Sequence, residues 1–190
     1  MKIGFQGDIG SNSEIAAQKL AEKFQFQNIS FVPLINSQNV VNALSKKQVD
    51  YGVMATKNII AGDVEETLLA LTPNIELIDT ITLPIHHFLF KKNKTAQIKY
   101  VASHIQALKQ TQETRKKLFS FDVKEVECSD TALAAKMLSD GIYPDSYGVI
   151  CREETGKMFQ LTLVAKNIED DKTNQTFFGL FKLKEQQEKI

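Results

Sequence analysis

The chain has 190 residues, 43% of them apolar, so it can bury a core as one large domain or two small lobes, and disorder is not expected. Lys plus Arg and Asp plus Glu number 23 each, so no net field attracts a nucleic acid or a membrane surface. No stretch reaches the roughly 20 apolar residues of a membrane span. A small-molecule ligand is therefore the better expectation.

The cysteines indicate a reducing compartment. The chain has only two cysteines, Cys128 and Cys151, which are far apart and lack the spacing of metal ligands. Such a pair fits a reducing compartment better than a disulfide framework. At the N-terminus, Asp8 interrupts the apolar run before a signal-peptide core can form. We therefore expect a cytoplasmic protein without a metal site or a cofactor.

Short apolar runs alternate with amphipathic segments, which predicts βα units around mainly parallel sheets and an α/β fold. Glycines Gly7 and Gly10 form the first turn, and Ser11 with Glu14 forms a capping box that opens the first helix. The elements expected up to the middle of the chain are strands 3–6, 29–33, 51–55, 76–83 and 88–91, with helices from Ser11, around Val40 to Leu44, and around Val64 to Leu71.

A second series follows the polar turn at 92–97. Its expected elements are strands 99–102, 121–126 and 147–151, helices 104–118 and 130–138, and a last strand at 176–183. Two βα series joined by extended segments predict two lobes with a cleft between them, because ligands of such sheets bind outside the carboxyl ends of the strands.

Several motifs of this chain resemble those of prephenate dehydratases. The segment Asn167 to Gly179 reads N-I-E-D-D-K-T-N-Q-T-F-F-G and resembles the family's closing motif, which runs from an Asp-Asp turn into Asn-x-Thr-Arg-Phe. Other segments resemble family motifs and occur in the family's order: Gly7-x-x-Gly10-x-x-Ser13-Glu14, Pro84 to His87, Ser103 to Leu108, and Asp130 to Met137.

The resemblance implies a fold and a reaction. It implies two lobes of the periplasmic-binding-protein type II kind, residues 1–82 plus 168–190 and residues 83–167, with the site in the inter-lobe cleft. The implied reaction converts prephenate to phenylpyruvate by decarboxylation and dehydration in phenylalanine biosynthesis, and the implied assembly is a homodimer. Most relatives continue into a phenylalanine-sensing ACT domain, which we do not expect within these residues.

The chain departs from the family's pattern at three polar positions. Where the family has Pro-Ile-Glu-Asn-Ser, this sequence keeps Asn58 but has Lys57 for the acid and Ile59 for the hydroxyl residue. Phe177 stands in place of the arginine of the closing motif. Because Arg115 and Arg152 are the only arginines and lie outside these motifs, we hypothesise that Lys57 supplies the missing cation from the opposite wall of the cleft, unless it is a solvated surface lysine.

The resemblance implies that Thr176 and Asn58 are catalytic. Thr176 can hydrogen-bond the departing ring hydroxyl, and otherwise it is a β-branched strand residue. Helix N-termini can hold the substrate's carboxylates, and Ser103 with Gln106 forms a second capping box. The expected substrate-binding residues are Ser11, Ser13, Lys57, Ser103, His104, Gln106, Thr131 and Phe177.

Two functions stay open at this point. The first is a prephenate dehydratase, a carbon–oxygen lyase with an altered site. The second is a non-catalytic protein that binds an aromatic acid or another small anion in the same cleft, because Phe177 and Ile59 make the cleft more apolar and weaken recognition of a dianion. His86 and His87 are expected to be structural.

Overall fold

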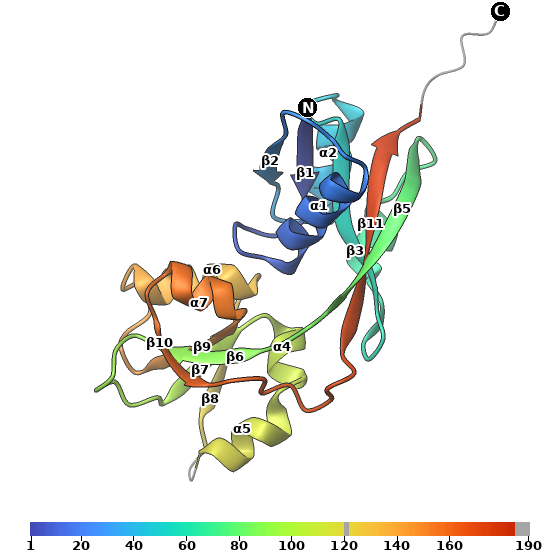
Figure 1. Cartoon of the computed structure of the whole chain (residues 1–190). Helices are drawn as coiled ribbons and strands as arrows, with labels where there is room; N and C mark the ends of the chain where they lie inside the picture. The colour runs from blue at the N-terminus through green and yellow to red at the C-terminus, as the bar shows by residue number, and fades with distance from the viewer. Residues whose placement is uncertain (120–121, 185–190) are drawn as a thin grey trace, which may run out of the picture. The chain divides into compact units, whose positions relative to one another are not determined.

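The structure, a computed structural model, describes residues 1–119 and 122–184. The chain divides into two compact units (Figure 1), one formed by Met1–Leu83 with Gln175–Ile190 and the other by Pro84–Asn174. Each unit has its own sheet covered by helices, which confirms the α/β fold class.

The sheet of the first unit has the strand order β2-β1-β3-β11-β5, with β4 paired to β3. Its first three strands are parallel, and β11 runs antiparallel to β3. The strands are β1 (Lys2–Phe5), β2 (Ser30–Pro33), β3 (Tyr51–Asn58), β4 (Gly62–Asp63), β5 (Ile75–Pro84) and β11 (Gln175–Leu183). The helices are α1 (Asn12–Lys23), α2 (Ser37–Ser45) and α3 (Glu65–Ala70).

Both faces of this sheet are covered by helices. Along β3, Val53 packs with Leu20 of α1, whereas the next residue, Met54, packs with Leu44 of α2 on the other side. Because successive strand residues point to opposite faces, a strand buried on both sides reads as a continuous apolar run. In α3, Thr67 and Ala70 face inward, whereas Leu68 is 56% exposed.

The sheet of the second unit has the order β10-β6-β9-β7-β8. Strands β7, β8 and β9 are parallel to one another, and β6 and β10 are antiparallel. The strands are β6 (Phe88–Lys91), β7 (Tyr100–Ser103), β8 (Lys124–Glu127), β9 (Tyr147–Cys151) and β10 (Thr162–Ala165). The helices are α4 (Ile105–Lys109), α5 (Gln112–Leu118), α6 (Thr131–Ser139) and α7 (Glu153–Met158).

Figure 1 shows α6 and α7 on one face of this sheet and α4 and α5 on the other. The two cores alternate along β9, where Val149 packs with Leu138 of α6 and Ile150 packs with Leu108 of α4. Neither α7 nor β10 is among the elements expected from the sequence. In α7, Gly156 lies so close to β6 that any Cβ there would overlap the Phe90 ring. Packing therefore requires glycine at this position, although glycine is unfavourable inside a helix.

The expected helix 104–118 is two helices. The break lies at Gln110 and Thr111, where the Thr111 hydroxyl donates to Ala107 O at 2.7 Å. The second helix, α5, has no side-chain bond from its own N-cap residue Thr111. Instead the carboxylate of Asp170 accepts from Glu113 N at 3.0 Å and from Thr114 N at 2.7 Å.

Two expected boundaries also differ. The segment 168–174, expected with the first lobe, lies in the second unit, where Ile168 N donates to His87 O and Asp170 N donates to Gln110 O. The strand expected at 121–126 is observed as β8, Lys124–Glu127, and Phe121 lies outside the described residues.

Candidate functional site

In each unit the expected site residues lie at the edge where the parallel strands end. Strand β3 ends at Asn58, and β11, which runs antiparallel to it, begins near Thr176 at the same edge. The helix α1 starts after the glycine loop that follows β1 and is capped by Ser11. The carboxyl ends of parallel strands are where α/β sheets bind ligands.

The two residues expected to be catalytic are neighbours across β3 and β11. Asn58 and Thr176 are register partners, and Asn58 Nδ2 donates to Thr176 Oγ1 at 2.8 Å. Both side chains are largely buried, with 8% and 9% exposed. The family resemblance implied a catalytic role for each residue, and the pairing of β3 with β11 brings them into contact.

The orientation of the Asn58 amide is fixed by further bonds. Its Nδ2 also donates to Gln175 O at 2.9 Å, and its Oδ1 accepts from Ile60 N and Ala61 N at 3.0 and 2.9 Å. With Oδ1 accepting twice, the group that faces Thr176 must be the amino group. Thr176 Oγ1 is therefore the acceptor in that bond, and its own O–H is directed elsewhere as a donor.

Two of the three departures from the family pattern are also register partners. Lys57 lies opposite Phe177 across β3 and β11, and opposite Asp63 across β3 and β4. Directly paired residues point to the same face of a sheet, and alternation puts Asn58 and Thr176 on the other face. The expected placement of Lys57 on the opposite wall is therefore wrong, since Lys57 and Phe177 are adjacent in one sheet, and its role as a cation for the substrate stays a prediction.

The third departure, Ile59, follows β3 and is 44% exposed, so it does not join the buried pair of Asn58 and Thr176. Its backbone N–H donates to Gln175 O at 3.0 Å. The segment that starts β11 is thus held by both the main chain and the Asn58 side chain.

The glycine loop forms the start of α1 as expected. Gly7 and Gly10 have φ angles of 90° and 89°, a region that other residues rarely adopt. Ser11 caps α1 by accepting from Glu14 N at 3.3 Å, while the Glu14 carboxylate accepts from Gly10 N at 2.6 Å. Ser11 and Ser13 are buried, and the carboxylate of Glu14 already occupies the electropositive start of the helix.

A second carboxylate, which the sequence analysis missed, lies at the start of α2. Glu66 of α3 accepts from Ser37 N at 2.7 Å and from Gln6 Nε2 at 2.9 Å. Gln6 in turn accepts from Ala55 N at 3.0 Å, so its amide joins β1, β3 and α3. Glu66 is 29 residues from Ser37 in the chain. No local pattern signals such a contact.

In the second unit, the expected residues Ser103, His104 and Thr131 lie where β7 ends and where α4 and α6 begin. The cap of α4 is His104, whose Nδ1 accepts from Gln106 N at 3.2 Å, and the expected capping box of Ser103 with Gln106 does not form. Ser103 is fully buried and donates to Ile150 O at 2.6 Å. Gln106 is exposed.

Thr131 is the first residue of α6, and the helix is capped by the residue before it. The carboxylate of Asp130 accepts from Ala132 N at 2.7 Å and from Leu133 N at 3.0 Å. The starts of α1, α2 and α6 thus each hold a carboxylate of the chain itself. A substrate carboxylate that binds at one of these helix starts would therefore have to displace an acid of the chain.

Arg152 is the candidate residue that sequence reasoning set aside. It directly follows β9 and is the N-cap of α7, so it lies at the same edge of the sheet as Ser103 and His104. Its Nε and Nη2 donate to Glu154 Oε2 at 3.3 and 3.2 Å. The other arginine, Arg115, is 5% exposed and is committed to Thr111, Leu108 and Glu125. The position of Arg152 right after a predicted parallel strand was the available signal.

His86 and His87 belong to a polar network around the buried carboxylate of Glu169. The Glu169 carboxylate accepts from His87 N at 3.0 Å and is 3.0 Å from His86 Nδ1. His87 Nε2 and Asn174 Nδ2 both lie 2.9 Å from Gln110 Oε1. The network joins the segment after β5 to the segment before β11, which favours the structural role expected for these histidines.

Ionisation in this network follows from burial and hydrogen bonding. Burial lowers the pKa of His87 below its ordinary value of 6.5, so the ring stays neutral. Burial raises the pKa of Glu169, but the bonds from His87 and His86 outweigh burial and hold that pKa below its ordinary value of 4.5. Glu169 is therefore a carboxylate paired inside the second unit.

Neither a metal site nor a membrane helix is found in the described part of the chain. Within residues 1–119 and 122–184, no group of three or more His, Cys, Asp and Glu side chains has a metal-binding arrangement. Over the same residues, every helix is too short or too polar to cross a bilayer.

Comparison with known proteins adds a family to this geometry. The family described as prephenate dehydratase matches residues 3–186. The chain is 30% identical over 181 residues to arogenate dehydratase/prephenate dehydratase 1 of Arabidopsis thaliana, covering 94% of this chain and 44% of that protein. It is 38% identical over 133 residues to a prephenate dehydratase of Methanocaldococcus jannaschii, covering 68% and 46%. It thus spans about half the length of these relatives.

The fold agrees with that of a solved member of the family. A prephenate dehydratase from Arthrobacter aurescens, solved in complex with L-Phe, superposes with a TM-score of 0.82 at 20% identity, covering 97% of this chain and 61% of that one. At this identity the likeness shows the fold alone. The match of the family over nearly all of the sequence shows more, and this chain belongs to the prephenate dehydratase family.

Proposed function

We propose that this chain acts as a prephenate dehydratase, converting prephenate to phenylpyruvate for phenylalanine biosynthesis. The observation that carries the proposal is the buried pair of Asn58 and Thr176 at the edge where ligands of α/β sheets bind. Family membership supplies the substrate class.

In this reaction the C–C bond to the ring carboxylate breaks, its electron pair moves into the ring, and the C–O bond to the ring hydroxyl breaks. The departing hydroxide takes one proton from solvent, so the products are carbon dioxide, water and phenylpyruvate with its aromatic ring. Thr176 O–H donates to the departing oxygen, and Asn58 fixes the direction of that donor by occupying Oγ1 from the other side. A threonine hydroxyl is too weak an acid to give up its proton fully, so it orients the oxygen and stabilises its charge.

Arg152 is the group best suited to hold a substrate carboxylate in the second unit. A guanidinium binds a carboxylate through two parallel N–H donors, which a lysine cannot do. Its present partner Glu154 is 66% exposed, so the pair is readily exchanged for a substrate carboxylate.

The test is the rate of phenylpyruvate formation from prephenate, followed by its absorbance in alkali, for the parent and for Thr176→Val and Thr176→Ser. Removing one preorganised donor to a developing negative charge costs on the order of 100- to 1,000-fold in kcat. We expect that loss in Thr176→Val, while Thr176→Ser retains most of the activity. Urea denaturation of both variants controls for folding, and an unchanged kcat in a folded Thr176→Val protein would contradict the role.

A second candidate function is the binding of an aromatic acid without turnover. It is favoured by Glu14, Glu66 and Asp130, which place three carboxylates at helix starts on the ligand-binding edges and oppose a dianion. Its signature would be a parent protein that forms no phenylpyruvate above the spontaneous rate, although calorimetry detects binding of phenylpyruvate or prephenate.

The homodimer and the cytoplasmic location remain parts of the proposal. The two free cysteines are buried, and burial raises the pKa of Cys151, so this thiol is inert in a reducing compartment. Size-exclusion chromatography with light scattering tests the homodimer, because a dimer has twice the mass of a monomer.

A further inference from the structure

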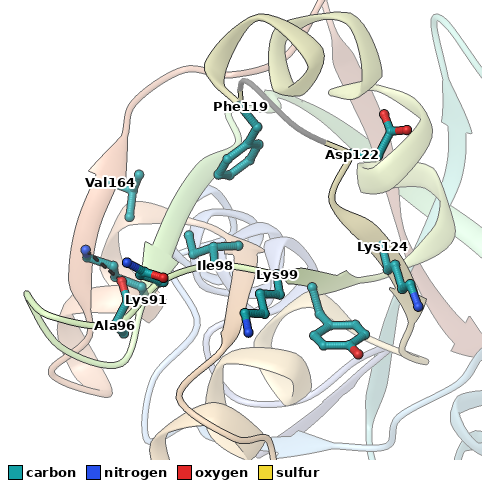
Figure 2. Close-up of a pocket in the computed structure, with 10 residues that line it drawn as sticks. Lys91, Ala96, Ile98, Lys99, Phe119, Asp122, Lys124 and Val164 are labelled. Carbon is teal, nitrogen blue, oxygen red and sulfur yellow. Dashed lines mark hydrogen bonds between the residues drawn. The ribbon is translucent and has the colours of Figure 1, made fainter.

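The second unit has a cavity at the edge of its sheet that lies away from the candidate residues. Its volume is about 750 Å³, within the range of small-molecule sites. Tyr100 and Lys124, which begin β7 and β8, line it, and Lys124 is labelled in Figure 2. Ser103 lies at the other end of β7, about 10 Å along the strand at 3.3 Å per residue. The cavity is therefore separate from the candidate site.

The lining combines an apolar surface with ammonium groups. Ile98, Phe119 and Val164 supply the apolar part, and Figure 2 shows their side chains around one opening. Phe119 also offers an aromatic ring, which favours offset or edge-to-face contact with a second ring.

Three lysines and one acid line the same cavity, namely Lys91, Lys99, Lys124 and Asp122. Lys91 is fixed by its donation to Lys94 O and Ala96 O at 2.8 and 3.0 Å. Lys124 lies 5.9 Å from the centroid of the Tyr100 ring, a cation–π distance. The three ammonium groups outnumber the one carboxylate by two, so the cavity attracts an anion. Its apolar side chains can pack against an apolar part of the same ligand.

We propose that this cavity binds a small aromatic monocarboxylate. The ring lies against Ile98, Phe119 and Val164, and the carboxylate faces the ammonium groups of Lys99 and Lys124. Lys91 adds positive charge while it holds the 92–97 turn. This site is independent of Thr176 and Asn58, which belong to the first unit, so its occupancy does not depend on the proposed reaction.

Titration calorimetry with benzoate tests the site, with benzamide as a neutral ligand of the same shape. We expect one benzoate per chain and weaker or undetectable binding of benzamide. The double variant Lys99→Glu with Lys124→Glu should bind benzoate at least about tenfold more weakly, because reversing charges a few ångströms from a carboxylate removes attraction and adds repulsion. Both lysines are exposed, so the fold should tolerate the change.

Lys94→Glu is the matched control, because Lys94 is an exposed lysine of the 92–97 turn and does not line the cavity. It should bind benzoate within about twofold of the parent. A second measurement, the amide NMR shifts of the parent on adding benzoate, should move residues 98–100 and Lys124 more than Ser11 or Ser103.

Three results would overturn the proposal: no benzoate binding at millimolar concentration, binding that the double variant leaves unchanged, or amide shifts confined to Ser11 and Ser103. The proposal and the dehydratase reaction fail separately. A Thr176→Val protein should bind benzoate like the parent, and the Lys99→Glu with Lys124→Glu protein should retain the parent's rate on prephenate.

Discussion

Lys57 and Phe177 are adjacent across β3 and β11, which changes what their replacement means. At these positions the family pattern has an acid and an arginine, a pair that would neutralise itself across the strands. Replacing only the arginine by phenylalanine would leave the acid opposite an apolar ring. In this chain the acid is a lysine, and Asp63, its register partner on β4, carries the opposite charge. The two departures therefore lie side by side, on the face opposite to Asn58 and Thr176.

At the same scale, Arg152 is the arginine placed to bind a substrate carboxylate at the carboxyl edge of the second unit's sheet. We predict that Arg152→Gln raises KM for prephenate about tenfold or more while kcat changes little, because a charge-assisted bond to a bound carboxylate is worth roughly 1.5 to 3 kcal/mol. Steady-state kinetics of the two variants Arg152→Gln and Arg152→Lys measure it.

Arg152→Lys should fall between parent and Arg152→Gln, because lysine keeps the charge and loses the paired donors. Arg115→Gln is not a suitable control, since that buried side chain supports the fold through Thr111 and Glu125. Glu154→Gln is the matched control, because it removes the present partner and should leave KM equal or lower. Equal KM values for all of these proteins would exclude Arg152 from the site.

At the scale of elements, α5 depends on a residue far away in the chain. Asp170 caps it through Glu113 N and Thr114 N, 57 and 56 residues away. We predict that Asp170→Ala lowers the free energy of unfolding by about 0.5 to 2 kcal/mol, the usual cost of losing a cap. Asp170→Asn, whose amide has one acceptor oxygen instead of two, should lose a smaller part. Urea denaturation at neutral pH measures both.

The same cap predicts a dependence on pH. Burial raises the pKa of Asp170, but the bonds from Thr114 and Glu113 outweigh it and hold the pKa below its ordinary value of 3.8. A carboxyl with a lowered folded-state pKa stabilises the fold above its unfolded pKa and loses this contribution as pH falls through the folded value. The difference between parent and Asp170→Ala should therefore shrink below pH 3.8, and a constant difference would contradict the capping account.

At the scale of the whole molecule, the two units differ in how the chain builds them. The second unit is the continuous segment Pro84–Asn174, and all five strands of its sheet lie within it. The first unit is discontinuous, because β11 lies between β3 and β5 in its sheet although it comes last in the chain.

We predict that residues 84–174, expressed alone, unfold cooperatively in urea with a slope of about 1 to 3 kcal/mol/M. Removing residues 175–190 should abolish the cooperative unfolding of the first unit, since its sheet loses an interior strand. Far-UV circular dichroism measures both, and tyrosine emission separates the units because Tyr51 lies in the first and Tyr100, Tyr143 and Tyr147 lie in the second. A fragment 84–174 without a cooperative transition would contradict this view.

The sequence by itself determined the α/β class, most strands and the start of α1, because apolar periodicity and local caps act over a few residues. It also determined the family, through motifs that occur in order along the chain. It did not determine the break between α4 and α5, the helix α7, or the contacts of Glu66 and Asp170, because each depends on a partner distant in sequence. Only the tertiary structure brought Asn58 to Thr176 and Lys57 to Phe177, since β3 and β11 are far apart in the chain and no turn between them fixes which side chains meet.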